Sequence, residues 1–314
     1  MYDVITVGSG TIDVFVGTGT RLFQDVKKGC VMVPFGSKIL AESLNICTGG
    51  GGTNTAVSLS RLGLKVAWLG KMGIGANSER ILKELKKERV DTSLVRRDSK
   101  CRTGFSVILD AKGHDRTIIA YKGSNDDLGW DEVNKKKLNA KWLYCSSMVG
   151  KSFKTLEKVV AYAKKNGIKV AFNPSSYLAK KGAGYLKNII KSTSLIVMNN
   201  EEASYLTKTK SIRQSLRKLA KLGPEIVVIT QGSKGCHAYS GKKIYSLKPH
   251  SIKVLETTGA GDAFASAFLA GIIKKNDIRF ALRLALANSE SVITHYGTKN
   301  KLLTWNEAMK KVKY

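Results

Sequence analysis

The stretch TTGAGDAF, residues 257–264, combines one carboxylate with a turn that has almost no side chains. Gly259, Ala260 and Gly261 stand directly before Asp262, and an apolar run with helical spacing follows. The first amides of a helix have no partner within it, so a bare turn there lets an anion approach them. A carboxylate beside such an anion hole can accept a proton from an attacking hydroxyl. Phosphoryl transfer needs both components, so the stretch predicts a site for that chemistry, although an aspartate also suits the first turn of a purely structural helix.

A second candidate is the run CTGGGGTN, in which four glycines, 49–52, precede Thr53 and Asn54 at the start of a predicted helix. Glycine has no Cβ, so a ligand can approach its backbone closely, and the amides of the helix start can donate to that ligand. The same glycines also suit a flexible hinge, and the two interpretations are compatible.

Polar residues follow three of the predicted strands. They are Asp13 in VGSGTID, Asn199 and Glu202 in IVMNNEEASYL, and Thr230, Gly232 and Gly235 in VVITQGSKG. Ligands of open α/β sheets bind beyond the carboxyl ends of the strands, so these residues are candidate ligand contacts. Glu202 in a first helical turn also suits the helix dipole without any function, and the two interpretations have equal weight.

Two familiar nucleotide-binding motifs are excluded. VGSGTID begins like the dinucleotide fingerprint G-x-G-x-x-G, but its sixth position is Asp13, and strand-like residues follow where the fingerprint requires a helix. CSSMVGKSF contains the Gly150-Lys151-Ser152 of a P-loop, but the glycine required five positions earlier is Cys145.

Alternating strands and helices must position the candidate residues. Apolar strand-like runs such as DVITVG, KVAWLGKMG, KWLYCSS, SLIVMNN and EIVVITQG alternate with amphipathic helical runs. That alternation predicts βαβ units, and therefore an α/β fold with a Rossmann-like, mostly parallel sheet flanked by helices.

Two segments, 13–48 and 101–123, break this alternation with strand patterns and glycine turns. FSVILDAKGHDRTIIAY is typical of a hairpin whose turn lies near DAKGHD. We therefore predict an α/β body formed by residues 1–12, 49–100 and 124–314, which binds nucleotide and substrate, and a small β-sheet lid formed by the two segments.

The charge of the chain is unusual, because 53 lysines and arginines oppose 24 acidic residues and give a net charge of +29. Such a balance would suit nucleic-acid binding. The basic residues are mostly lysines spread along helical runs, however, whereas nucleic-acid recognition needs a focused patch. Solvated helix faces are therefore the favoured interpretation, and a nucleic-acid partner is not expected.

Five cysteines and four histidines are scattered without a C-x-x-C pair, which favours reduced thiols over a disulfide scaffold or a zinc site. The first residues lack the basic and apolar regions of a secretory signal. No apolar run approaches the ~20 residues of a membrane span. The sequence thus predicts a cytoplasmic protein with no membrane partner.

TTGAGDAF resembles the C-terminal signature of the ribokinase/PfkB carbohydrate kinase family, and GGGGTNTAVSLSRLG…LGKMG resembles its N-terminal signature. The resemblance extends over essentially the whole chain, the predicted lid segments included. It implies a ribokinase-like fold and an enzyme that uses ATP and Mg²⁺ to phosphorylate a hydroxymethyl group of a sugar or nucleoside.

The resemblance also implies individual roles. The catalytic group would be Asp262 as base, with an anion hole from Gly259, Ala260 and Gly261. Substrate would be bound by Asp13, Gly50, Gly51, Asn54 and Asn173. ATP would be bound by Asn199, Thr230, Gly232, Gly235 and Asn288. Magnesium would be organised by Glu202, largely through water, and a monovalent cation would be held near Glu256.

Two positions depart from the family pattern. Many members have aspartate where this chain has Glu256, and the added methylene leaves a requirement for K⁺ open. Where ribokinase-like members often present a substrate-binding acid after the strand KWLYCSS, this chain has Ser146, Ser147 and Met148. A standard ribokinase substrate pocket is therefore not expected.

Taken together, these features predict an ATP-dependent kinase of a small sugar, with a nucleoside as the second choice. Phe15, Phe35 and Phe105 are candidates for stacking on a base, although packing is the favoured role for each. A non-catalytic nucleic-acid-binding protein is the alternative from another class. Family members commonly dimerise through the lid sheet, so a homodimer formed through this sheet is a further expectation from the resemblance.

Overall fold

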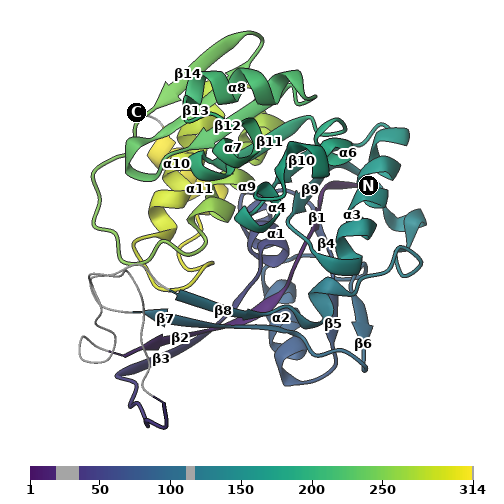
Figure 1. Ribbon diagram of the computed structural model, residues 1–314, viewed down its shortest axis with the longest axis vertical. Helices are drawn as coiled ribbons and strands as arrows, with labels where there is room; N and C mark the ends of the chain where they lie inside the picture. Colours follow the sequence, from purple (N-terminus) through teal and green to yellow (C-terminus); the bar gives the residue numbers. More distant parts are fainter. Residues whose placement is uncertain (19–34, 111–116, 313–314) are drawn as a thin grey trace.

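The computed structural model describes residues 1–18, 35–110 and 117–312 and contains two main sheets (Figure 1). The larger sheet has eight strands in the order β14-β13-β12-β11-β10-β9-β1-β4. Their bounds are β1 Tyr2–Val7, β4 Val66–Leu69, β9 Ala140–Ser146, β10 Lys169–Asn173, β11 Leu195–Asn199, β12 Ile226–Thr230, β13 Cys236–Ser240 and β14 Lys243–Leu247. The strands from β4 to β12 pair in parallel, and β13 and β14 continue the sheet antiparallel. The predicted mostly parallel α/β sheet is confirmed.

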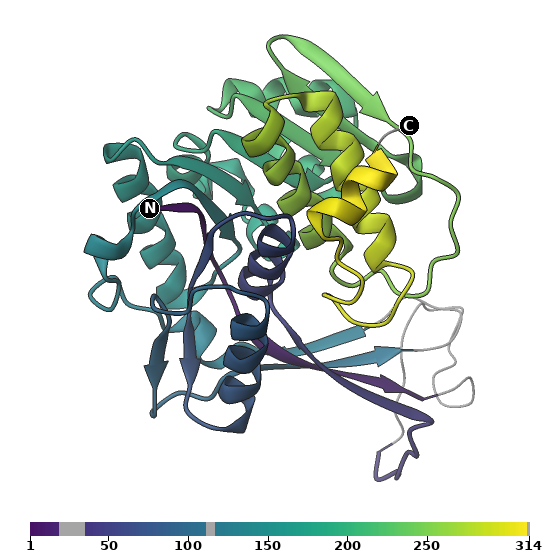
Figure 2. The same ribbon diagram turned by 180° about the vertical axis from the view of Figure 1, so that it is seen from behind.

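Helices cover both faces of this sheet, as Figures 1 and 2 show from opposite sides. One face packs against α1 Gly51–Arg61, α2 Ala76–Lys87, α9 Ala260–Lys275, α10 Ile278–Val292 and α11 Trp305–Val312. The other packs against α3 Gly150–Lys165, α4 Ser176–Ala179, α6 Lys187–Ile190, α7 Asn200–Thr207 and α8 Ile212–Lys221, with α5 Gly182–Tyr185 beside α7. The strands are apolar on both sides because both faces are covered.

Helix α9 is the most deeply buried of these helices. Its residues from Ala263 to Ile272 are all buried, and many are small. Small residues let neighbouring helices approach, and a Cβ added to Gly271 would lie 2.6 Å from the Cα of Ala281 in α10. The position of α9 is therefore fixed by close packing, and so is that of the carboxylate in its first turn.

The second sheet has four strands in the order β3-β2-β7-β8, and in Figure 1 it projects from the body. Its strands are β2 Thr11–Gly17, β3 Ser43–Gly49, β7 Gly104–Asp110 and β8 Thr117–Tyr121. β7 and β8 form the predicted antiparallel hairpin, whose turn at 111–116 lies outside the described residues. The predicted lid segments thus supply a separate sheet, although β2 begins two residues before the first segment, and residues 19–34 of that segment also lie outside the description.

Two local expectations differ from the structure. The run KVAWLGKMG forms two strands, because the chain breaks at Gly70 between β4 and β5 Lys71–Gly73; a Cβ at Gly70 would lie 2.4 Å from the Trp68 ring. β5 pairs with β6 Arg96–Asp98 in a small sheet of its own. Asp13 lies inside β2 of the second sheet, because the first strand already ends at Val7.

Three short 3₁₀ segments complete the described chain: η1 Gly123–Asp126, η2 Lys135–Lys137 and η3 Gly232–Lys234. None of the helices in the described ranges has the length and apolar character that crossing a bilayer requires.

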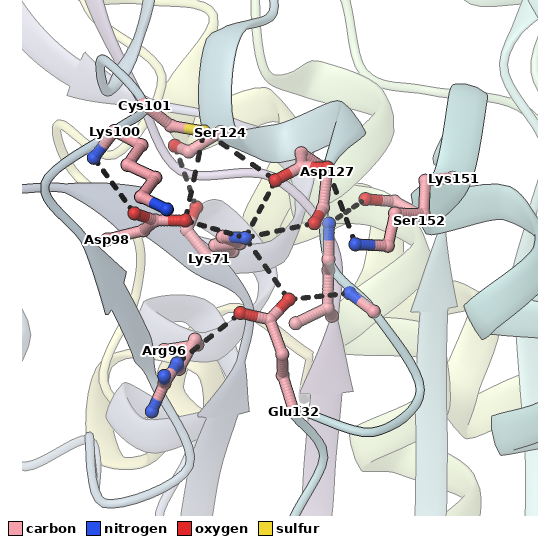
Figure 3. Close-up of polar contacts among 12 residues, drawn as sticks. Lys71, Arg96, Asp98, Lys100, Cys101, Ser124, Asp127, Glu132, Lys151 and Ser152 are labelled. Carbon is pink, nitrogen blue, oxygen red and sulfur yellow. Dashed lines mark hydrogen bonds and ion pairs between the residues drawn. The ribbon is translucent and has the colours of Figure 1, made fainter.

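A buried lysine of the body, Lys71, contacts the chain segments that lead into β7 and out of β8 (Figure 3). Lys71 is 2% exposed, and its Nζ lies 2.8 Å from Asp127 Oδ2, 3.0 Å from Asp98 Oδ2 and 3.1 Å from Glu132 Oε2. Asp98 precedes β7 and Asp127 follows η1, so the ion pairs hold the chain where it leaves and re-enters the body. Asp98, Asp127 and Cys101 lie close enough to ligate a metal ion, but the ammonium of Lys71 already pairs with both carboxylates.

Candidate active site

Asp262 lies in the first turn of α9, behind a turn that requires glycine. Gly259 is the N-cap residue and has a φ of 86°, and a Cβ there would lie 2.8 Å from the Cα of Thr298. Gly261 is exposed, and a Cβ at this position would meet no atom within 4 Å. The two glycines therefore serve different ends: the first permits the left-handed turn, and the second leaves the helix start open to a ligand.

The structure differs from the predicted anion hole at one of its three amides. The N–H of Ala260 donates to the carbonyl of Thr257 at 3.2 Å, so it is not free to bind an anion. Gly259 and Gly261 remain the candidate donors of the predicted set.

The carboxylate of Asp262 is oriented by Asn54 of α1. Asn54 Nδ2 donates to Asp262 Oδ2 at 2.8 Å, and Asn54 Oδ1 accepts from Thr298 Oγ1 at 3.0 Å. Burial raises the pKa of Asp262 above its usual value, while the hydrogen bond from Asn54 acts in the opposite direction. In this structure Asn54 therefore positions the carboxylate; its predicted contact with substrate stays a prediction.

Two of the four glycines, Gly50 and Gly52, pack the start of α1 against the chain that follows β1. Gly50 is the N-cap residue with a φ of 96°, and a Cβ there would lie 2.5 Å from the carbonyl oxygen of Ser9. That carbonyl accepts from the amides of Gly52 and Thr53 at 3.0 and 3.3 Å, so these amides are not available to a ligand. Gly51 faces the cavity in front of Asp262, where a Cβ would come within 3.6 Å of Asp262 Oδ1.

Asp13 of β2 is 6% exposed, and its charge contributes to raising the pKa of Asp262. Its Oδ1 accepts from Thr11 Oγ1 at 2.9 Å, and a Cβ at Gly49 would lie 1.7 Å from its Oδ2, so only glycine fits there. Burial raises the pKa of Asp13, and the charges of Lys299 and Lys122 partly offset that effect.

Three cavities meet around the first turn of α9. The first, about 200 Å³, is lined by Asp262, Gly51, Asn173 and the residues that follow β9. The second, about 240 Å³, shares Asn173 and Asp262 with the first and adds Asn199, Glu202, Thr230 and Gly259. The third, about 710 Å³, shares Thr230, Thr257 and Gly261 with the second. Asp262 therefore stands between a small polar cavity and a path to a large one.

The second cavity contains Asn199 and Glu202, which form a capping box at the start of α7. Asn199 Oδ1 accepts from the Glu202 amide at 2.8 Å, and Glu202 Oε2 accepts from the Asn199 amide at 3.0 Å. Burial raises the pKa of Glu202 to about 7. The pair therefore has a structural role, because it caps the start of α7. Glu202 also lines the cavity, where its carboxylate could hold a magnesium ion through water.

The third cavity has apolar walls and a glycine-rich turn. Phe264, Leu286, Ile293 and Val254 supply apolar surface, and Thr230, Gly232 and Gly235 lie in the lining as predicted for nucleotide contacts. Its volume is within the ~300–1,000 Å³ typical of sites for ligands of nucleotide size.

Asn288 does not line this cavity, and its predicted contact with ATP stays a prediction. Its side chain is fully buried, with Nδ2 donating to Ala263 O at 3.0 Å and Oδ1 accepting from the Leu303 amide at 3.0 Å. Asparagine at this point links α10 to α9 and to the chain before α11. The cavity wall on α10 is formed instead by Leu286, Ser289 and Glu290.

Glu256 is 7% exposed and lies three residues before the anion-hole turn. Its Oε1 accepts from the amide of Thr258 at 2.8 Å and from Thr258 Oγ1 at 2.6 Å. The carboxylate thus stabilises the turn, and its part in binding a monovalent cation stays a prediction.

Several residues around the site were not predicted. Lys122 and Asp126 come from the connection after β8, and Ser175 and Tyr177 come from the start of α4. Lys299 is 6% exposed and pairs with Glu84 of α2 at 2.7 Å. A position directly after a strand was the available signal for Lys122 and Ser175; nothing in the sequence pattern distinguishes Lys299 from the other lysines.

The three phenylalanines considered for base stacking lie elsewhere. Phe15 is 3% exposed, Phe35 is fully exposed, and Phe105 lines a separate cavity beside the start of α2. Among the described residues that line the cavity of about 200 Å³, the aromatic ring is that of Tyr177, with Lys122 Nζ 5.0 Å from its centroid.

Comparison with known proteins places the chain in a family. A model of the pfkB family of carbohydrate kinases matches residues 14–305. An uncharacterized sugar kinase of Archaeoglobus fulgidus is 31% identical over 78% of this chain and 98% of the relative. A ribokinase of Haemophilus influenzae is 28% identical over 89% of this chain and 93% of the relative.

Among solved structures, an Arabidopsis thaliana ribokinase complexed with ribose and ATP is similar with a TM-score of 0.82, covering 100% of this chain and 99% of that one at 23% identity. The fold is therefore the ribokinase-like α/β fold. The chain belongs to the pfkB family of carbohydrate kinases, as its sequence signatures predicted.

Proposed function

We propose that this protein transfers the γ-phosphoryl group of ATP to a hydroxymethyl group of a small sugar. The observation that carries the proposal is the place of Asp262, which lines both the small polar cavity and the cavity that leads to the nucleotide-sized one. A base between acceptor and donor sites, at an open helix start, suits in-line transfer.

In the proposed reaction Asp262 takes the proton of the attacking hydroxyl. The hydroxyl oxygen forms a bond to the γ-phosphorus while the bond from that phosphorus to the bridging oxygen of ADP breaks. The amides of Gly259 and Gly261 would donate to the transferred group, where negative charge is concentrated. A pKa raised by burial makes Asp262 a better proton acceptor than an ordinary surface aspartate.

The cavities fit the two predicted cofactors. The apolar cavity of about 710 Å³ would hold the base and ribose of ATP, with the Gly232–Gly235 turn beside the phosphates. Magnesium prefers oxygen ligands and keeps several waters, so Glu202 and Asn199 would hold it through water, and the ion would neutralise phosphate charge. A requirement for potassium at Glu256 remains a prediction of the same kind.

We further propose that the four-stranded sheet is a lid that closes over the sugar and excludes water. Asp13 supports this role, because it belongs to β2 of the second sheet while its charge acts on Asp262 of the body. Homodimerisation through this sheet and a cytoplasmic location are the remaining expectations of the proposal.

A small sugar is favoured over a nucleoside as the acceptor. A cavity of about 200 Å³ lies below the range usual for larger ligands, and its lining is mostly polar. Asn173 lines this cavity and would offer its amide group to sugar hydroxyls. Asp13 does not line the cavity, but it lies close enough to Asp262 for its charge to raise the pKa of that residue, and we propose that it binds a sugar hydroxyl as well.

The proposal is tested by ADP release from ATP and Mg²⁺ in the presence of neutral sugars, sugar acids, sugar phosphates and nucleosides. We expect release that depends on one sugar class, with a phosphorylated product identified by mass spectrometry. Nucleoside-dependent release would favour the second choice. Salt-sensitive binding of DNA or RNA with no acceptor-dependent release would favour the nucleic-acid-binding alternative and contradict the proposal.

A further inference from the structure

The acceptor cavity carries a cation at its wall. Lys122 follows β8, is half-buried and lines the same cavity as Asp262. Its Nζ lies 5.0 Å from the centroid of the Tyr177 ring, and within the described part of the chain no carboxylate pairs with it at ion-pair distance. A cation held over a ring at a cavity wall is positioned to meet an anionic ligand.

Two buried hydroxyls line this cavity without a partner among the described residues. Ser146 is the last residue of β9, and Ser175 follows β10. The Oγ atom of each is buried and has no hydrogen bond among the described residues. Neighbouring Ser147 is engaged, because its Oγ accepts from the Ser175 amide. Buried polar groups are normally satisfied, so a ligand or water must supply the partners that these two hydroxyls lack.

The end of β9 is also neutral where a carboxylate would repel an anion. Ser146, Ser147 and Met148 line the cavity at that point. The acidic groups of the lining are Asp262, which the reaction uses, and Asp126 beside η1. One ammonium matches a carboxylate, which carries one charge; a phosphate dianion would bring a second charge into a cavity that Asp126 also lines.

We propose that the acceptor of this kinase is a sugar acid, a polyhydroxylated carboxylate whose carboxylate group is bound by Lys122. The hydroxyls of Ser146 and Ser175 would bind the same molecule along its length, with its terminal hydroxymethyl group at Asp262. The inference rests on the proposed kinase function and adds the class of substrate and the residue that selects it.

The test compares acceptors that carry a carboxylate with acceptors that lack one. The sugar acids are D-gluconate, D-galactonate and the 2-keto and 5-keto derivatives of gluconate; the neutral set is D-glucose, D-ribose and D-fructose, and D-glucose 6-phosphate is the dianion. We expect at least one sugar acid to have the highest kcat/KM, by tenfold or more over every neutral sugar. Protection from thermal unfolding by each compound gives a second readout that does not need turnover.

The variant Lys122→Met removes the ammonium and keeps most of the stem. It should lower kcat/KM for the sugar acid on the order of tenfold to a hundredfold, mainly through KM, since a charge-assisted contact is lost. Turnover of a neutral sugar should change less than twofold. Lys122→Arg should retain the preference for the acid. Lys180→Met is the matched control, because Lys180 also lies over a tyrosine ring, 5.6 Å from the Tyr205 centroid, but does not line the cavity.

The outcomes separate the two proposals. Turnover of a neutral sugar or of glucose 6-phosphate in preference to every acid would overturn the sugar-acid inference and leave the kinase function intact. Equal loss for acids and neutral sugars in Lys122→Met would overturn it as well. No acceptor-dependent ADP release and no thermal protection by any compound would contradict the kinase function itself.

Discussion

Two charged centres in this molecule, one buried and one half-buried, differ in how completely their charges are paired. Lys71 is 2% exposed and contacts three carboxylates. Asp262, at the start of α9, has a hydrogen bond from Asn54 and otherwise faces cavities. Burial alone would lower the pKa of Lys71, but the hydrogen bonds that its ammonium donates to Asp127, Asp98 and Glu132 raise that pKa above its usual value. Burial raises the pKa of Asp262 and so favours its neutral form.

The difference separates a charge that stabilises the fold from a charge that is available for chemistry. The ammonium of Lys71 keeps its proton because three carboxylates stabilise its charge, and its ion pairs hold the connections to the second sheet in place. A carboxylate with one partner and open space keeps a lone pair for a ligand. The energetic consequences of removing the two groups should therefore be opposite in kind.

The largest expected effect is on turnover. Asp262→Asn should lower kcat by about three orders of magnitude, because a general base contributes ~10²–10⁴-fold. The free energy of unfolding should stay the same or rise slightly, since a poorly paired charge is removed. Steady-state kinetics, ATP binding and urea unfolding measure the three quantities. Near-normal turnover, or a large loss of stability, would break the comparison.

A pH effect should follow from Glu202, a buried carboxylate of the site. Its pKa is about 7 in the folded chain and near 4.5 when unfolded, so the unfolded state loses its proton first as pH rises. Stability should therefore fall between about pH 4.5 and 7 and then level off, by about 3 kcal/mol from this group. Urea unfolding at pH 5 and pH 8 of wild type and Glu202→Gln isolates the difference; parallel curves would contradict it. Lys71, whose pKa is raised, should add no slope in this window.

Removing the paired charge should cost stability. Lys71→Met leaves three carboxylates together, and we expect a loss of about 2–3 kcal/mol, less than the ~3–5 kcal/mol of a fully buried pair because the Asp127 side chain is 43% exposed. Lys141→Met, which removes a 54% exposed partner of Asp3, is the control and should change stability by less than about 1 kcal/mol. Equal losses of unfolding free energy in Lys71→Met and Lys141→Met would show that the Lys71 ion pairs stabilise the fold no more than an exposed ion pair does.

The smallest effect tests how Asp262 is held. Asn54→Ala removes the hydrogen bond that lowers the pKa of Asp262, so the acid limb of the kcat/KM profile should move to higher pH. We also expect kcat to fall about tenfold, the equivalent of one hydrogen bond to a charged group. Asn166→Ala, which removes an exposed bond at the end of α3, is the control. An unchanged pH profile would mean that Asn54 does not position the base.

Much of the site was predictable because its residues follow strands or start helices. Asp262, Gly51, Glu202 and Thr230 belong to contiguous motifs, and the parallel sheet brings such motifs to one edge. That Leu286, Ser289 and Glu290, and not Asn288, line the large cavity could not be predicted, because a helical position does not reveal which side of α10 faces the cavity. Lys122 and Ser175 also follow strands, but that position alone does not show that they share a cavity with Asp262, which lies far away along the chain.

The sequence by itself determined the alternating elements, the second sheet and the family, since hydrophobic periodicity and glycine turns are local properties. It also fixed which carboxylate stands at a bare helix start. Tertiary structure decided which amides of that turn are free, that Lys71 pairs with three acids, and that Lys122 and two unpartnered serines share a cavity with Asp262. These facts depend on contacts between distant segments, and such contacts exist only once the sheet, helices and connections have packed together.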